Sequence, residues 1–190
     1  MFSDIFSLVI DTLSQLYLFI ILMRFVLQVA KADFYNPISQ FVFKATNPLL
    51  IPLRRVIPGF AGIDFASIVL AVLFQGIVLA LKVAVLSQAL PNPLSILMLS
   101  FVMILGLLLK IYFWSLLIMI ISSWIAPGSN HPILMLINQI TEPLMKPFRS
   151  ILPSMGGLDL SPILVFLVLQ VLETIVGHLL QQIGMSFPLI

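Results

Sequence analysis

The chain has 190 residues, of which 61% are hydrophobic and 8% are charged, and its formal net charge is +2. This composition excludes an ordinary soluble globular protein and indicates a chain embedded in a lipid bilayer. The small net charge argues against nucleic acid as a partner. The absence of cysteine excludes disulfides, thiolate metal sites and thiol nucleophiles.

Four apolar stretches are long enough to cross a bilayer, since a helical crossing takes about 20 residues. Asp4 and Asp11 stand where a signal peptide would carry positive charge, so we expect the first stretch to be retained. The first and third stretches are followed by polar, proline-containing loops, and a tight turn around Pro91 joins the second and third. The stretches are residues 5–30, 65–90, 96–125 and 161–186, and the loops are residues 31–64 and 126–160.

The chain repeats itself, because residues 17–75 recur without a gap as residues 112–170. We therefore divide it into two modules, residues 1–95 and 96–190, each consisting of a span, a loop and a span. A module with two spans returns the chain to its starting side, so the repeats are parallel rather than inverted. The predicted fold is an all-α membrane protein with four transmembrane helices and both termini on one side.

The basic residues indicate the orientation, because cytoplasmic flanks retain Lys and Arg. Six of them fall in the two long loops, whereas the tails and the Pro91 turn have none. We expect a multi-pass protein of the bacterial cytoplasmic (inner) membrane, with the long loops in the cytoplasm and the termini outside. Arg24, near the cytoplasmic end of its span, is expected to extend outward to the headgroups.

Each loop should contain a short amphipathic helix. Asn36-Pro37 and His131-Pro132 offer a capping residue followed by proline at the first helical position. Apolar residues then follow at helical spacing. These are Ile38, Phe41, Val42 and Ala45 in the first loop and Ile133, Leu136, Ile137 and Ile140 in the second. We expect the helices to lie in the interface or to re-enter the membrane, and to end at Pro48 and Pro143.

The repeat is strongest in a proline-rich motif that ends each loop. Its residues are Thr46, Pro48, Pro52, Arg54, Pro58, Gly62 and Asp64 in the first copy, and Thr141, Pro143, Pro147, Arg149, Pro153, Gly157 and Asp159 in the second. The two aspartates precede spans and favour helix N-caps over functional carboxylates. Arg54 and Arg149 fit interfacial anchoring and the binding of an anionic lipid or partner equally well.

This motif, present twice, resembles the YggT family of small bacterial membrane proteins, related to YlmG and to CCB3-type plastid proteins. Two complete modules look like the two-repeat bacterial form. The resemblance implies links to osmotic or ion homeostasis, to cell division and envelope organisation, and in plastids to haem attachment. It implies no settled activity. The copies differ where Asn47 is matched by Glu142 and Ile51 by Lys146.

Several polar side chains lie at membrane depth, where ionisable groups are functional candidates by default. The candidates are Gln75, Lys82, Lys110, Gln170, Glu173 and His178, and Asp11 and Ser14 add a polar face to the first span. One hypothesis is an ion site in which Glu173 pairs with Lys82 or Lys110 and His178 titrates beside it. The other, which the sequence favours, is an internal salt bridge between helices.

We find no catalytic, metal-binding or cofactor-binding pattern in the sequence, and we expect a non-enzymatic protein. The favoured role is to organise or assist a membrane process through the two loops, and the alternative is a small channel or ion-homeostasis factor using Glu173, Lys82 and Lys110. The expected partners are the bilayer with its anionic headgroups, an unidentified membrane protein, and a second copy of the chain.

Overall fold

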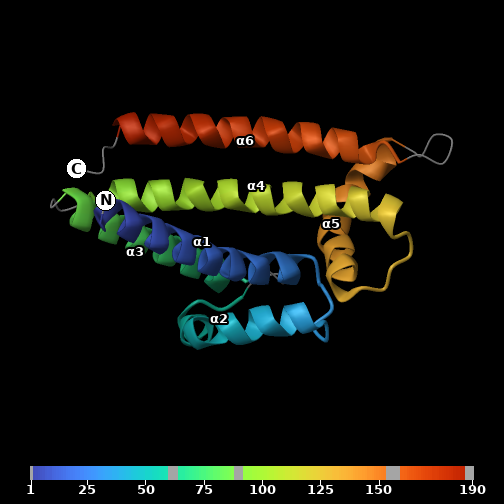
Figure 1. Ribbon diagram of the computed structural model, residues 1–190, viewed down its shortest axis with the longest axis horizontal. Coiled ribbons are helices and arrows are strands. Elements are labelled where there is room, and N and C mark those ends of the chain that lie inside the picture. Colours follow the sequence, from blue (N-terminus) through green and yellow to red (C-terminus); the bar gives the residue numbers. More distant parts are fainter. Residues whose placement is uncertain (1, 60–63, 88–91, 153–158, 187–190) are drawn as a thin grey trace.

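The computed structural model describes residues 2–59, 64–87, 92–152 and 159–186, which are almost entirely helical (Figure 1). The element order within these ranges is α1 (Phe2–Val29), α2 (Pro37–Val56), α3 (Phe65–Ser87), α4 (Pro93–Ile125), α5 (Pro132–Ile151) and α6 (Ser161–Ser186). The predicted all-α fold is confirmed.

Four of these helices are long and apolar enough to cross a membrane, as the sequence predicted. The segments are Ser7–Val29, Phe65–Val85, Pro93–Ile125 and Ser161–Gly184. The third begins earlier than expected because Asn92 caps it, its side chain accepting from the Leu94 N–H at 3.0 Å, and Pro93 takes the first helical position. Large apolar side chains such as Leu8 and Ile77 remain more than half exposed, the pattern of spans with lipid-facing sides.

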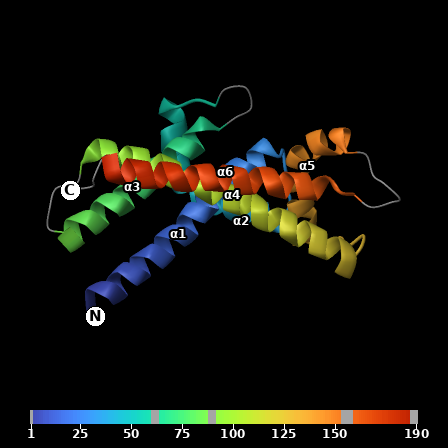
Figure 2. The ribbon, with the colours of Figure 1, turned by 90° about the horizontal axis from the view of Figure 1, so that it is seen from above.

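The four spans form a row in the order α1, α3, α4, α6. α3 packs against both α1 and α4, and α6 packs against α4 and α5. Figure 1 shows α4 between α6 and the α1–α3 pair, with the start of α1 and the end of α6 at the same end of the molecule. Figure 2 shows α5 at the opposite end from the start of α1. α1 and α6 are therefore the two edges of the row.

Two apolar clusters hold the row together. The larger one is built on α1, where Ile21, Leu22 and Val26 are almost fully buried, and it extends to α2, α3, α4 and α5. The smaller one joins Leu116 of α4 and Met145 of α5 to the inner face of α6. The first half of the chain thus contributes most of the core, whereas α6 is held along one side only.

The expectation that the loop helices end at Pro48 and Pro143 is wrong, since α2 and α5 continue through two prolines each. The prolines stand four residues apart, as Pro48 and Pro52 do in α2, so each pair shares one helix face, and that face is exposed. The backbone carbonyls that lose a partner are therefore on the outer side, where water or headgroups can satisfy them.

The amphipathic character of the loop helices is confirmed, although the buried face of α2 differs from the predicted one. Phe41 is 59% exposed, and the buried face consists of Ser39, Val42, Thr46 and Leu50. The prediction used the spacing of hydrophobic residues alone, so it did not place polar Ser39 and Thr46 on the buried face. In α5 the predicted Leu136, Ile137 and Ile140 are buried, whereas Ile133 is exposed.

The starts of the two loop helices are linked across the repeats. The Asn36 side chain caps α2 by accepting from the Ile38 N–H at 2.9 Å, and its Nδ2 donates to the Pro132 carbonyl at 2.8 Å. The Gln139 Oε1 atom accepts from the Asp33 N–H at 2.9 Å. The capping role predicted for Asn36 is confirmed, but His131 makes no side-chain capping hydrogen bond.

Candidate functional site

The repeated motif of the first module closes on an ion pair. Arg54, near the end of α2, reaches back to Asp64 at the start of α3. Its Nε donates to Asp64 Oδ1 at 3.3 Å, its Nη2 donates to Oδ2, and the Ser67 hydroxyl donates to Oδ2 at 2.6 Å. The Asp64 side chain is 2% exposed and that of Arg54 is 38% exposed. We call this set of three residues the first lock.

The electrostatics of the first lock favour the ionised carboxylate. Burial alone would raise the pKa of Asp64, but the hydrogen bonds from Arg54 and Ser67 and the nearby positive charges outweigh burial and lower the pKa from its ordinary value of 3.8. The ion pair therefore contributes its full stability above pH 3.8 and loses it as the pH falls through the lower, folded-state pKa.

The second module contains the equivalent lock in a more open form. Arg149 Nε donates to Asp159 Oδ2 at 3.0 Å, and its Nη1 donates to Glu142 Oε2 at 2.7 Å. The Arg149 and Asp159 side chains are 41% and 38% exposed and line a cavity of about 770 Å³. Burial alone would raise the pKa of Asp159, but the hydrogen bonds from Ser161 and Arg149 and the positive charge of Arg149 together outweigh burial and lower the pKa.

The two locks show what the aspartates and arginines of the repeated motif contact. Asp159 is an N-cap, since its Oδ1 accepts from the Ser161 N–H at 2.9 Å, as predicted. Asp64 holds the start of α3 through the Ser67 hydroxyl and backbone instead. Arg54 and Arg149, considered for anchoring or for binding an external anion, each pair with an aspartate of their own motif.

The remaining motif residues have simpler positions. Pro58 is exposed just after α2. Gly62, Pro153 and Gly157 lie outside the described residues.

Arg24 does not extend to the headgroups, and that expectation is wrong. Its side chain is in the interior, with the residue 3% exposed. Nη1 lies 2.8 Å from Thr46 Oγ1, 2.7 Å from Asn47 Oδ1 and 3.2 Å from the Phe43 carbonyl, and the guanidinium carbon is 4.5 Å from the Phe43 ring centre. Arg24, near the C-terminal end of α1, thus holds the middle of α2 against that helix.

The second module replaces this arginine by methionine at the equivalent position, Met119. The Thr141 hydroxyl, equivalent to that of Thr46, lies 3.1 Å from Met119 Sδ. Glu142, equivalent to Asn47, pairs with Arg149 instead. The motif threonines therefore face the same partner position in both modules, which holds a charged guanidinium in the first and an uncharged thioether in the second.

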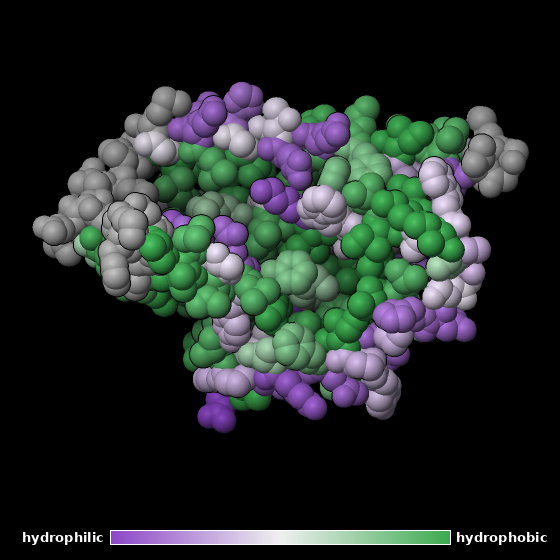
Figure 3. Space-filling model, in the orientation of Figure 1, coloured by the Kyte–Doolittle hydropathy of each residue, from purple (hydrophilic) through white to green (hydrophobic). Residues whose placement is uncertain are grey.

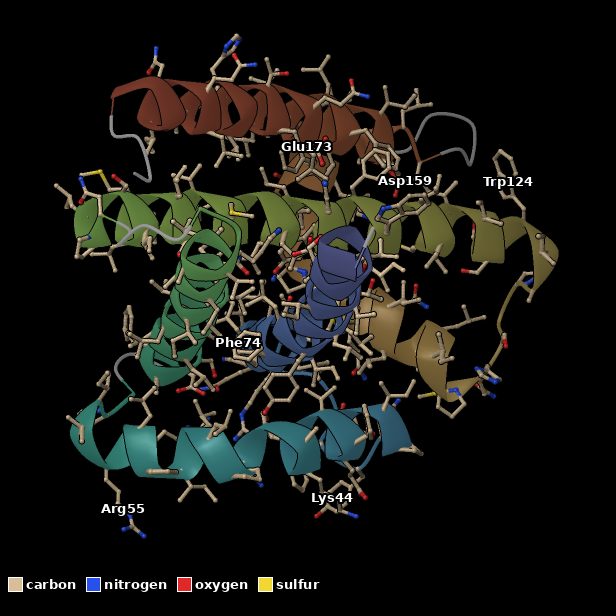
Figure 4. The ribbon with its side chains drawn as sticks, turned by 60° about the vertical axis from the view of Figure 1, so that its left-hand side comes forward. Lys44, Arg55, Phe74, Trp124, Asp159 and Glu173 are labelled. Atoms are coloured by element: carbon tan, nitrogen blue, oxygen red, sulfur yellow. The ribbon has the colours of Figure 1, made fainter. Side chains whose placement is uncertain are left out.

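The intramembrane polar residues gather around one cavity of about 530 Å³ between the four spans. Every span contributes at least one polar side chain to it. These side chains are Asp11, Ser14 and Gln15 of α1, Gln75 and Lys82 of α3, Lys110 of α4 and Glu173 of α6. Figure 4 shows Glu173 pointing from α6 toward α4.

The charges in this cavity pair differently from the prediction. Lys82 Nζ contacts both carboxylate oxygens of Asp11, at 2.8 and 2.9 Å, so its partner is Asp11 and not Glu173. Within the described part of the chain, Glu173 and Lys110 have no ion-pair partner within 4.0 Å. The sequence marked Asp11 as part of a polar face but not as the partner of Lys82, because the pairing depends on how α1 and α3 cross.

Two of the predicted membrane-depth candidates lie outside the cavity. Gln170 and His178 are exposed on α6 and do not line it, so His178 does not join Glu173 in the cavity. Gln75, the repeat equivalent of Gln170, is buried, and its Nε2 lies 3.5 Å from Met103 Sδ. Equivalent positions in the two modules therefore have different environments.

Comparisons with known proteins agree with the repeat. The sequence profile of the CCB3/YggT family matches residues 3–86 and again residues 98–180. An uncharacterized protein of Pseudomonas aeruginosa, PA0392, is 49% identical over 179 residues, covering 93% of this chain and 91% of that protein.

More distant relatives show the same pattern. The uncharacterized protein YggT of Escherichia coli K12 is 39% identical over 184 residues, covering 94% of this chain and 92% of that protein. The uncharacterized protein ycf19 of Guillardia theta is 40% identical over 74 residues, which is 37% of this chain and 79% of that protein. No solved structure matches. Since both halves fit one family profile, the chain belongs to the CCB3/YggT family.

Proposed function

We propose that the protein is a non-enzymatic ion-homeostasis factor that binds a small ion or polar solute in the cavity between its four spans. The observation that carries this proposal is the convergence of Asp11, Lys82, Lys110 and Glu173 on one cavity. In this proposal the loop end faces the cytoplasm across the inner membrane, and the cellular process served is resistance to osmotic stress, with its links to envelope organisation and division.

The charges support a binding role better than a purely structural one. Lys82 and Asp11 neutralise each other, which is what a structural salt bridge requires. Glu173 is 12 residues from the start of α6, about 18 Å along the helix at about 1.5 Å per residue, and so lies within the roughly 30 Å hydrocarbon core. A charge at that depth without a protein partner is costly unless water or a bound ion compensates it.

The test is a flux measurement on the purified protein in liposomes, with potassium and protons as separate probes. We expect Glu173→Gln to abolish the flux while the protein still folds, because the substitution removes the charge and keeps the shape. His178→Gln is the matched control, since His178 is ionisable and on the same helix but outside the cavity. Equal flux in wild type and Glu173→Gln would refute the proposal.

A second candidate function is the organising role expected from the loops, and the outer face of α2 supports it. Lys44 and Arg55 are exposed, and Figure 4 shows both pointing away from the bundle. Exposed Phe41, Leu49 and Ile51 lie on the same helix. Basic side chains beside exposed apolar ones suit anionic headgroups or a membrane protein partner. Arg54 and Arg149 contribute little to the binding of an external anion, because each forms an ion pair with an aspartate of its own motif.

Photocrosslinking from this face tests the second candidate. A photoreactive residue at Lys44 or Arg55 should give one discrete protein adduct in living cells, whereas the same residue at Ile175, exposed on the outer side of α6, should not. Labelling of lipid alone from Lys44 would identify a membrane-surface role instead of a protein partner. Adducts of equal yield from all three positions would count against a specific partner.

A further inference from the structure

A polar stripe runs along an exposed face of α6. Its positions alternate between three and four residues apart, and every one of them is exposed. They are Leu167, Gln170, Thr174, Gly177, Gln181 and Gly184. Figure 3 shows hydrophilic side chains along the top of the view, over α6. We call this set of residues the α6 stripe.

The α6 stripe is not suited to contact lipid. Gln170 is nine residues from the start of α6, about 14 Å along the helix and near the middle of the hydrocarbon core. Its side-chain amide has no hydrogen-bond partner among the residues that the structure describes. An amide left without a partner in hydrocarbon is strongly disfavoured, so we expect a hydrogen-bonding partner beyond these residues.

The first repeat shows what this helix face does when it is covered. Gln75, equivalent to Gln170, is buried where α3 packs against α4, and its amide contacts Met103. α6 is at the edge of the row, and among the described helices it packs against α4 and α5 only on its other side. The same packing face is therefore covered in one module and open in the other.

We propose that a second copy of this chain covers the α6 stripe, with the two α6 helices side by side and parallel about a twofold axis along the membrane normal. All copies enter the membrane in the same orientation, so such an axis places equal depths opposite each other. The stripe is uncharged, and amides both donate and accept, so Gln170 and Gln181 can each bond to their own counterpart.

The spacing of the stripe residues and the glycines among them also favour a second copy of the chain as the partner. Alternation of three and four residues is the spacing of helices that pack in parallel as coiled coils, in which a polar residue on the seam fixes the register. A Cβ added at Gly184 would meet no atom within 4 Å among the described residues, and Gly184 does not line the cavity. The space beside this glycine is thus open to a neighbouring helix, which small residues allow to approach closely. Gly177 stands where the stripe borders the cavity.

Disulfide crosslinking in native membranes tests the proposal, because the chain has no cysteine of its own. Thr174→Cys should give a disulfide-linked dimer on oxidation, as should Gln170→Cys. Ile175→Cys is the matched control: it is exposed and next in sequence, hence at nearly the same depth, but on another face of the helix. No dimer from Thr174→Cys, or equal yields from Thr174→Cys and Ile175→Cys, would overturn the proposal.

A second variant separates association from folding. Gly184→Leu adds a side chain at a position where a Cβ meets no atom within 4 Å among the described residues and which does not line the cavity, so the fold and the cavity should be kept. It should lower self-association in liposomes by about tenfold, since it blocks close approach of the two helices along the seam. Unchanged association of a folded Gly184→Leu variant would refute the pairing.

Pairing through the α6 stripe is a different property from ion binding in the cavity, and an experiment can contradict either one without the other. Glu173→Gln, which removes the cavity charge, is expected to leave crosslinking through Thr174→Cys unchanged. Loss of that crosslink in Glu173→Gln would show that the dimer depends on the cavity rather than on the stripe, and would contradict the pairing as stated.

Discussion

Replacing Asp64 with Asn is expected to destabilise the protein by about 2–3 kcal/mol. Removing one partner of a buried ion pair costs about 3–5 kcal/mol, because the other charge is left without compensation. Here the figure is reduced, since the Arg54 side chain is 38% exposed and partly screened by solvent. Arg24 and Arg54 would then lie close together with the carboxylate between them lost. The measurement is reversible unfolding in mixed detergent micelles.

The same substitution in the second lock is the natural control. Asp159→Asn should cost only about 0.5–1 kcal/mol, because its pair with Arg149 is exposed on both sides, Glu142 remains as a partner, and asparagine can still cap α6. The acid dependence should also differ, because Asp64→Asn removes the loss of stability that wild type shows below pH 3.8. Equal costs for the two substitutions would mean that burial does not decide the strength of the locks.

The sequence predicted the spans and the repeat well, because both depend on average composition and on spacing. Four apolar stretches and a recurring motif can be recognised without knowing which side chains meet. The Asp159 cap was predictable for a related reason, since capping is decided within one turn of the helix. Local and compositional rules were enough for these features.

Contacts between elements were not predictable in the same way. Lys82 could have met any acidic residue at its depth, and only the crossing of α1 over α3 selects Asp11. Arg24 was assigned to the membrane surface because arginine near a span end usually extends there. The structure instead provides three acceptors on α2 in the interior, and those acceptors become visible only when the packing of α2 against α1 is known.

The internal repeat also led us to expect similar environments for equivalent residues, and the two modules of the structure are less alike than that. Equivalent residues such as Gln75 and Gln170 differ in burial, since the first module packs against the second whereas the second has a free edge. Duplication therefore preserved the locks within each module but not the surroundings of each module. The positions where the copies diverge, Arg24 against Met119 and Asn47 against Glu142, are the positions where a test can use one copy as the reference for the other.

Arg24→Met is accordingly expected to cost much less than Arg24→Ala, about 1 kcal/mol against about 3 kcal/mol. Methionine at position 24 would recreate the arrangement of the second module, in which the motif threonine contacts the sulfur of Met119. It would also remove a buried charge close to Arg54, and replacing a buried charge by an apolar side chain of similar size is often tolerated. Both substitutions take the donor away from the three acceptors on α2, and alanine leaves a void in addition.

Unfolding of both variants in mixed micelles measures the difference, and Met119→Ala in the second module measures the cost of a void at the equivalent position. If Arg24→Met and Arg24→Ala lose the same stability, the volume of the side chain at position 24 matters less than the polar contacts of Arg24 with α2, and the equivalence with Met119 fails. If Arg24→Met is the more damaging of the two, a methionine side chain does not fit between α1 and α2. In that case the contact between Met119 and Thr141 is particular to the second module.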